Sequence, residues 1–170
     1  MITLKNNVEF KDFSVQVNKA LEEKALQFLH EASGELVAKA ADNSRHDTGQ
    51  LMQSWDYQID KSILQSQVGS PLENAIWEEF GTGEYAVEGK GRKGYWVYVK
   101  GSSSSSSSTS YSTKSYTLKQ AKQIMRMLRE QGLEAYYTRG KKPNHTLEKS
   151  FKANKNKIIA RAKQVFKDIK

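Results

Sequence analysis

The sequence predicts an α+β fold in which two long amphipathic helices pack on a small antiparallel sheet. Two observations carry this prediction. Apolar residues recur at helical spacing near each end of the chain, and short segments between them alternate apolar and polar residues. The 170 residues fit one ordinary domain, and a chain of this size can bury about 70% of its unfolded surface without a disulfide or metal.

The first long helix is predicted over residues 14–40. Its apolar side chains lie on one helical face: Leu21, Ala25, Phe28, Leu29, Ala32 and Leu36. Asp12 or Ser14 is expected to cap its amino terminus, because short polar side chains accept hydrogen bonds from the free N–H groups there.

A structural turn is predicted at Asp47, Thr48 and Gly49, because the first two are cap-type residues that precede a short helical segment. Two segments that alternate apolar and polar residues follow it. They predict the strands of a β-hairpin at 55–59 and 63–68.

A short helix is predicted over 71–80, with Pro71 in the first turn and a glycine after the last residue. Ile76, Trp77 and Phe80 are expected to point inward from this helix, as its large apolar side chains.

Residues 81–94 contain five of the eleven glycines, so we expect a mobile loop or extended arm there. A strand is predicted at 95–99. Residues 102–108 are an unbroken serine run inside a polar segment at 101–115, which predicts a flexible linker.

After the linker, the sequence predicts a helix at 117–130 that stops at Gly132, and a short strand at 133–137. The second long helix is predicted at 144–169. Its apolar face consists of Leu147, Phe151, Ile158, Ala162, Val165 and Ile169.

The predicted domain organisation follows from these elements. Residues 1–100 and 133–170 form one α+β domain, and residues 101–132 interrupt it with the serine-rich linker and an inserted helix.

The composition excludes several classes of protein. The absence of cysteine excludes disulfide scaffolds, thiolate zinc sites, iron–sulfur clusters and cysteine nucleophiles. Apolar runs of three or four residues are far shorter than the ~20 that a membrane span needs, and the amino-terminal residues have no secretory apolar segment. We therefore expect a soluble protein made in a cytoplasm, with no membrane partner.

The net charge of +8 is unevenly distributed along the chain. Residues 1–85 hold 7 Lys and Arg and 14 Asp and Glu, whereas residues 86–170 hold 20 and 5. Such polarity indicates either a nucleic-acid surface or subunits that meet acidic face to basic face.

No motif predicts catalysis. His30, His46 and His145 lie in three different elements and do not share helical spacing, so no metal site is expected. His46 and the many serines suggest a hydrolase only weakly, since no Gly-x-Ser-x-Gly turn is present. The expected protein is not an enzyme and has no cofactor or small-molecule substrate.

Two binding hypotheses remain for the middle of the chain. The glycine-rich basic loop has aromatic neighbours that are able to stack on nucleic-acid bases, although a core role for those aromatics is favoured: Tyr85, Tyr95, Trp96 and Tyr98. The acidic residues Glu73, Glu78, Glu79 and Glu84 form either a solvated helix face or a patch that docks on the basic segment of the next subunit.

An ordered series of short motifs resembles a known family. The series is DTGQL at 47–51 with Ser54, VGS at 68–70, EEFGTG at 78–83, GKGRK at 89–93 before WVY at 96–98, and TRGKKP at 138–143. It is similar to the tail-component family of tailed bacteriophages typified by gene product ten of a lambda-like siphophage. Each motif alone is weak, but together they cover about 13–99 and 136–168.

The resemblance implies a non-enzymatic virion protein of the tail or neck, assembled in the host bacterial cytoplasm. Its implied role is a ring, expected to be a hexamer, at the head-proximal end of the tail, in tail completion or head–tail joining. The implied partners are copies of itself, neck or connector proteins, and tail-tube or tail terminator proteins. A passing contact with genomic DNA is also implied. The same function is expected in prophages or tail-like particles.

Residues 101–132 depart from the family pattern, in which the WVY strand and the TRG turn are joined by a short hairpin. The segment AKQIMRMLREQGLEAYYT locally resembles half of a SPOR-like peptidoglycan-binding repeat, but an inserted packing helix is the preferred interpretation.

Contacts with neighbouring subunits or tail proteins are expected from Glu78, Glu79, Arg92, Lys93 and Arg139. The alternative function from another class is a basic nucleic-acid-binding module, which steeply salt-dependent DNA binding by a monomer would favour.

Overall fold

The computed structural model describes residues 13–46, 49–100 and 114–167. Its elements follow this order along the chain: α1 (Ser14–Asn43), α2 (Gln50–Gln53), β1 (Asp56–Asp60), β2 (Gln65–Gly69), α3 (Glu73–Phe80), the 3-10 turn η1 (Gly83–Tyr85), β3 (Trp96–Val99), α4 (Leu118–Glu130), β4 (Ala135–Thr138) and α5 (Thr146–Phe166). This element content confirms the predicted α+β class.

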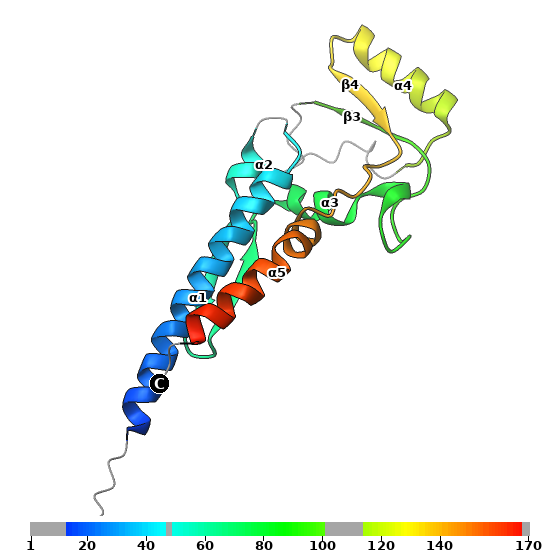
Figure 1. Cartoon of the computed structure of the whole chain (residues 1–170). Helices are drawn as coiled ribbons and strands as arrows, with labels where there is room; N and C mark the ends of the chain where they lie inside the picture. The colour runs from blue at the N-terminus through cyan, green and yellow to red at the C-terminus, as the bar shows by residue number, and fades with distance from the viewer. Residues whose placement is uncertain (1–12, 47–48, 101–113, 168–170) are drawn as a thin grey trace, which may run out of the picture.

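The molecule has an elongated body and a smaller head (Figure 1). In the body, α1 packs along α5 on one side and against the β1–β2 hairpin on the other, and α3 also contacts α5. In the head, α4 packs on the β3–β4 pair. The two strand pairs are separate antiparallel sheets in the described part of the chain, where the sequence predicted one small sheet.

Each part has its own small core. Ala40, Leu51, Trp55 and Ala75 are buried in the body, whereas Val97, Ala121 and Ala135 are buried in the head. Small side chains fill much of both cores because the helices and strands approach each other closely. The low apolar content of the chain, with a mean hydropathy of −0.74, is therefore sufficient for two thin cores.

The inserted helix begins and ends as its sequence predicts. The Thr117 hydroxyl accepts the N–H of Gln120, and the Gln120 side chain accepts the N–H of Thr117, which forms a capping box. Gly132 follows the helix with a φ of 81°, a conformation that glycine adopts without strain. Ala121, Ile124, Met125 and Leu128 face the head core.

Two expectations about the long helices, the burial of Phe151 and of Leu21, are wrong, and the cap prediction is tested only at Ser14. Ser14 is the first residue of α1, and Phe13 stands at the cap position without a side-chain cap bond; Asp12 lies outside the described residues. Phe151 on α5 is 51% exposed, because α5 turns that side away from α1. Leu21 is 43% exposed, since the first turns of α1 extend beyond the body.

The short helix α3 presents the face opposite to the one that was predicted. Ala75 and Glu78 are its buried residues, whereas Ile76, Trp77 and Phe80 are 59%, 45% and 56% exposed. The prediction that these large side chains point inward is wrong. The reason is tertiary: the Glu78 carboxylate has cationic partners on the inner side, and this pairing fixes the rotation of the helix.

None of the described helices is both long and apolar enough to span a membrane. The serine run at 102–108, Asp47, Thr48 and Ile169 lie outside the described residues. The division of the chain into 1–100 with 133–170 and an insertion at 101–132 stays a prediction.

Candidate interaction site

Two motifs that lie about sixty residues apart in the sequence meet in a single junction, formed by residues 78–85 and 139–145. The Thr82 N–H donates to the Lys141 carbonyl at 2.9 Å, and the Glu84 N–H donates to the Arg139 carbonyl at 3.0 Å. In return, the Lys141 N–H donates to the Thr82 hydroxyl at 2.9 Å. The EEFGTG and TRGKKP segments are therefore held together backbone to backbone.

Glycine is required at the junction because the two backbones approach too closely for a side chain. A Cβ added to Gly83, whose φ is 60°, would lie 2.4 Å from the Arg139 carbonyl oxygen. A Cβ added to Gly140 would lie 2.1 Å from the Thr82 carbonyl oxygen. These glycines serve close packing. The structure thus differs from the expected mobile arm, at least over the part of 81–94 that forms the junction.

Glu78 holds the junction from inside the subunit. Its side chain is 3% exposed; the Lys141 ammonium contacts one carboxylate oxygen, and the Arg45 Nε lies 3.7 Å from the other. Its backbone carbonyl accepts the Asn144 N–H at 2.6 Å. A buried carboxylate needs such partners, because removing it from water is costly.

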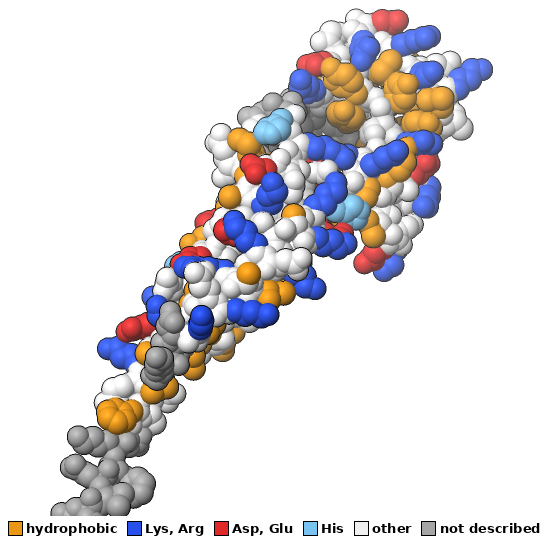
Figure 2. Space-filling view, viewed as in Figure 1, with side chains coloured by type: hydrophobic (Ala, Val, Ile, Leu, Met, Phe, Trp, Pro, Cys, Tyr) orange, Lys and Arg blue, Asp and Glu red, His pale blue; other side chains and the backbone are white. Residues whose placement is uncertain are grey.

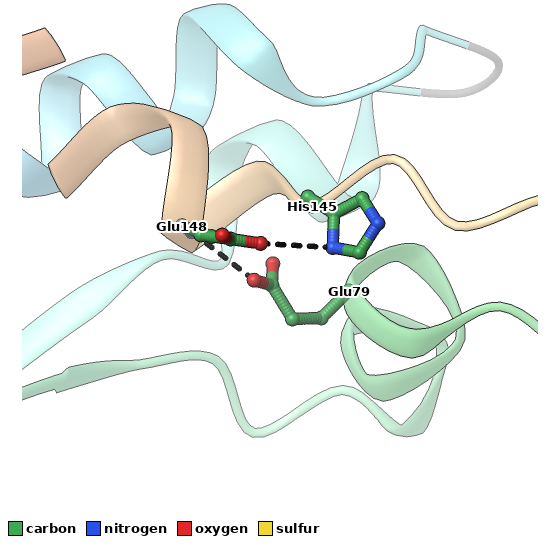
Figure 3. A group of neighbouring side chains, drawn as sticks. All are labelled: Glu79, His145 and Glu148. Carbon is green, nitrogen blue, oxygen red and sulfur yellow. Dashed lines mark hydrogen bonds and ion pairs between the residues drawn. The ribbon is translucent and has the colours of Figure 1, made fainter. Parts of the chain in front are cut away.

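Glu79 caps the amino terminus of α5. Its Oε2 accepts the Leu147 N–H at 2.7 Å. Its Oε1 accepts the Glu148 N–H at 3.1 Å, a bond that Figure 3 draws. His145 stands at the cap position with a φ of 54° and makes no side-chain cap bond. The cap is therefore supplied by another helix, and a cap of this kind leaves no local signal in the sequence.

The same residues form a group of three possible metal ligands. The ligand atoms of Glu79, His145 and Glu148 all lie within 4.8 Å of one another, and the His145 Nδ1 lies 3.1 Å from a Glu148 oxygen. However, both oxygens of Glu79 already accept backbone N–H groups. We interpret the group as a helix cap with a contact between His145 and Glu148 beside it.

Arg139 extends from the junction toward solvent. Its Nε donates to the Tyr85 hydroxyl at 2.7 Å, and its guanidinium lies 3.6 Å from the Glu84 carboxylate. The hydrogen bond to Tyr85 raises the pKa of Arg139 above its ordinary value. Its side chain is 47% exposed, so the guanidinium remains accessible.

The other two predicted contact residues lie on the loop before β3. The Arg92 guanidinium stacks 4.9 Å from the centre of the Trp96 ring, and its Nε donates to the Ser115 hydroxyl at 3.4 Å. Lys93 is exposed. In the predicted turn, Gly49 has a φ of 77° and immediately precedes α2.

A surface that the sequence did not predict lies beside the junction. Ile76, Trp77 and Phe80 share the outer face of α3, and Val87, which is 54% exposed, donates its N–H to the Phe80 carbonyl at 3.0 Å. We call these four residues the apolar α3 patch. Large exposed apolar side chains that gather in one place mark interaction surfaces.

The geometry is that of a binding surface built on a rigid junction. The family model described as a bacteriophage HK97-gp10 tail component matches residues 9–100, which are 92 of the 170 residues. Neither the curated proteins nor the solved structures that were compared gave a match. The match includes α3, η1 and β3, whereas the TRGKKP turn and α5 lie beyond it. The chain belongs to the HK97-gp10-like family of bacteriophage tail components.

Proposed function

We propose that this tail component is a structural protein that assembles into a ring, predicted to be a hexamer, at the head-proximal end of the tail. There it would complete the tail or join it to the head. Its neighbours would be neck or connector proteins and tail-tube or tail terminator proteins, and the genome would pass close to it. Its action is association, with no chemical step.

The apolar α3 patch is the observation that carries this proposal. Each of its four side chains is about half exposed in the single subunit. Burying a large apolar side chain contributes about 1.5–3 kcal/mol, so covering the patch with another protein surface would stabilise an assembly by several kcal/mol. The rigid junction behind α3 would hold the patch in one orientation.

Charged residues at the edge of this surface fit the polar rim that surrounds most interfaces. We propose that Arg92, Lys93 and Arg139 contact the partner there. Glu78 and Glu79 lie on the inner side of α3, so we propose that they act indirectly, by fixing the orientation of the helix.

The oligomeric state of the full chain tests the proposal. We expect native mass spectrometry to show a ring, either alone or with added tail-tube subunits. The variant Ile76→Ser with Phe80→Ser should lose the assembly. The matched control is Ile63→Ser with Met127→Ser, which changes two equally exposed apolar residues outside the patch and should assemble normally.

Two results would contradict the proposal. The first is a strict monomer that binds neither tail-tube subunits nor connectors. The second is an assembly that tolerates the patch variant as well as the control. Circular dichroism of both variants would show that each remains folded.

The alternative function, a basic nucleic-acid-binding module, is favoured by a separate feature of the head. Lys and Arg side chains are exposed on the head as well as along the body (Figure 2), and no ring is needed for those of the head to meet a polyanion.

A further inference from the structure

The charge imbalance between the two halves of the sequence is partly resolved inside the subunit. Four acidic residues of the first half pair with basic residues of the second half: Glu31 with Arg161, Glu35 with Lys157, Glu78 with Lys141 and Glu84 with Arg139. The first two pairs join α1 to α5. These acidic groups are therefore already occupied and are poor candidates to neutralise a basic surface on another copy.

The basic residues of α4 are not part of this network. Lys119, Lys122 and Arg126 are exposed, and no ion pair joins them to the described part of the chain. Arg129 completes the series but is held by β4: its Nε donates to the Ala135 carbonyl at 2.9 Å, and its guanidinium lies 5.3 Å from the centre of the Tyr136 ring. The only acidic residue of α4 is Glu130. Four cations against this one carboxylate leave the helix with a net positive charge.

The four cations lie along one side of the helix. At 3.6 residues per turn, Lys119, Lys122, Arg126 and Arg129 fall within an arc of about 80°, next to the apolar face that packs on β3 and β4. We call these four residues the α4 basic stripe. By contrast, the exposed Lys149, Lys155 and Lys163 of α5 spread over an arc of about 120°.

The stripe is long enough to face several phosphates of a nucleic-acid strand. Lys119 and Arg126 are seven residues apart, which is about 10.5 Å along the helix axis. One strand of B-DNA carries a phosphate about every 3.4 Å along its axis, hence about three phosphates over that length. We infer that the α4 basic stripe binds the phosphate backbone of duplex DNA. This inference goes beyond the proposed ring and does not require it.

The aromatic residues of the head add no requirement for base sequence. Tyr98 and Tyr136 stack on the sheet face opposite α4, with their ring centres 5.7 Å apart. The stripe itself holds only cations, which contact phosphates without reading bases. Binding should therefore be independent of sequence and strongly dependent on salt.

The test measures binding of the full chain to a labelled 30-base-pair duplex by fluorescence anisotropy over a series of salt concentrations. The variant Lys119→Gln, Lys122→Gln, Arg126→Gln should lose roughly tenfold or more in affinity at low salt. The slope of log affinity against log salt should become shallower by about 2.7, because about 0.9 is lost for each phosphate contact.

Two further variants test whether the loss of affinity comes from the position of the charges on α4, and not from the net charge of the chain or from misfolding. Lys149→Gln, Lys155→Gln, Lys163→Gln on α5 removes the same charge and should change the affinity less than about threefold, since these residues lie on the body and not on α4. Lys119→Arg, Lys122→Arg, Arg126→Lys keeps the charge and should bind as the wild type does.

Each contrary result overturns the inference. An equal loss in the α4 and α5 variants would show that only net charge matters, and no binding to the duplex would exclude the site. Tighter binding to a duplex RNA of the same length, or to polyglutamate, would assign the stripe to RNA or to an acidic protein. The ring test above is independent, because the apolar α3 patch variant keeps the whole stripe.

Discussion

Glu79 of α3 and Leu147 of α5 lie 68 positions apart in the sequence and are joined by a hydrogen bond. The Glu79 carboxylate accepts the Leu147 N–H at 2.7 Å. A second bond from the Glu148 N–H reaches the other oxygen. The free N–H groups and the positive end of the α5 dipole both favour a carboxylate at this place. The bond thus fixes the start of α5 against α3, the helix that carries the apolar α3 patch.

Replacing Glu79 should lower the free energy of unfolding by the amount that a helix cap contributes. We expect Glu79→Ala to lower the free energy of unfolding by about 1–2 kcal/mol, and Glu79→Gln to lower it less, because the amide oxygen still accepts one N–H. Urea unfolding measures both. The control Glu22→Ala, at an exposed residue of α1, should stay within about 0.5 kcal/mol of the wild type. Equal losses at the two sites would refute the capping role.

Alanine variants of Gly83 and Gly89 distinguish the free-energy cost of close packing from that of a left-handed backbone. Both residues have a positive φ, 60° at Gly83 and 66° at Gly89. A Cβ added to Gly83 would clash with the Arg139 carbonyl, whereas a Cβ added to Gly89 would meet no atom within 4 Å. We expect Gly89→Ala to cost about 1–2 kcal/mol from its left-handed backbone alone. Gly83→Ala should cost about 1–3 kcal/mol more, because the junction backbone must move. Similar unfolding free energies for the two variants would show that the junction is loosely packed.

The pairing of α1 with α5 should make stability depend on pH through Glu31. Hydrogen bonds from Arg161, and then from Gln27, lower the pKa of Glu31 from its ordinary value of 4.5 to about 2. Because the pKa is lower in the folded state, the carboxylate stabilises the fold fully above about pH 4.5. This contribution is lost as the pH falls toward 2.

The measurement compares the free energy of unfolding of the wild type and Glu31→Gln between pH 7 and pH 2. We expect a constant difference at neutral pH that shrinks below about pH 4.5 and is lost near pH 2. Arg161→Gln removes the main partner and should reduce the same pH-dependent difference, because the Gln27 hydrogen bond remains. A difference between wild type and Glu31→Gln that persists unchanged to pH 2 would contradict the assignment.

Much of the fold could be predicted because its signals are local. The helix predicted at 117–130, the glycine after it and the alternating residues of the β1–β2 hairpin depend on their immediate neighbours, and the structure confirms each of them. The family match likewise confirms the resemblance that the ordered motifs indicated. In each case the residues that define the element also stabilise it.

The outer face of α3 could not be predicted, because its rotation depends on partners far away in the sequence. An eight-residue helix with Ile76, Trp77 and Phe80 on one side is expected to bury them. Instead, Arg45 and Lys141 pair with the Glu78 carboxylate, and Glu79 caps α5, so the acidic side faces inward. Neither the buried carboxylates nor the exposed patch has a signal within α3 itself.

The sequence by itself determined the element types, the family motifs and the separation of charge between the two halves of the chain. Only the tertiary structure decided where those charges act. By placing α1 along α5 and the EEFGTG segment against the TRGKKP turn, the fold pairs acidic with basic residues inside the subunit. Among the described residues, it leaves the α4 basic stripe outside these ion pairs and the apolar α3 patch uncovered. The reason is physical: ion pairs and buried surfaces depend on distances in space, which the order of residues does not specify.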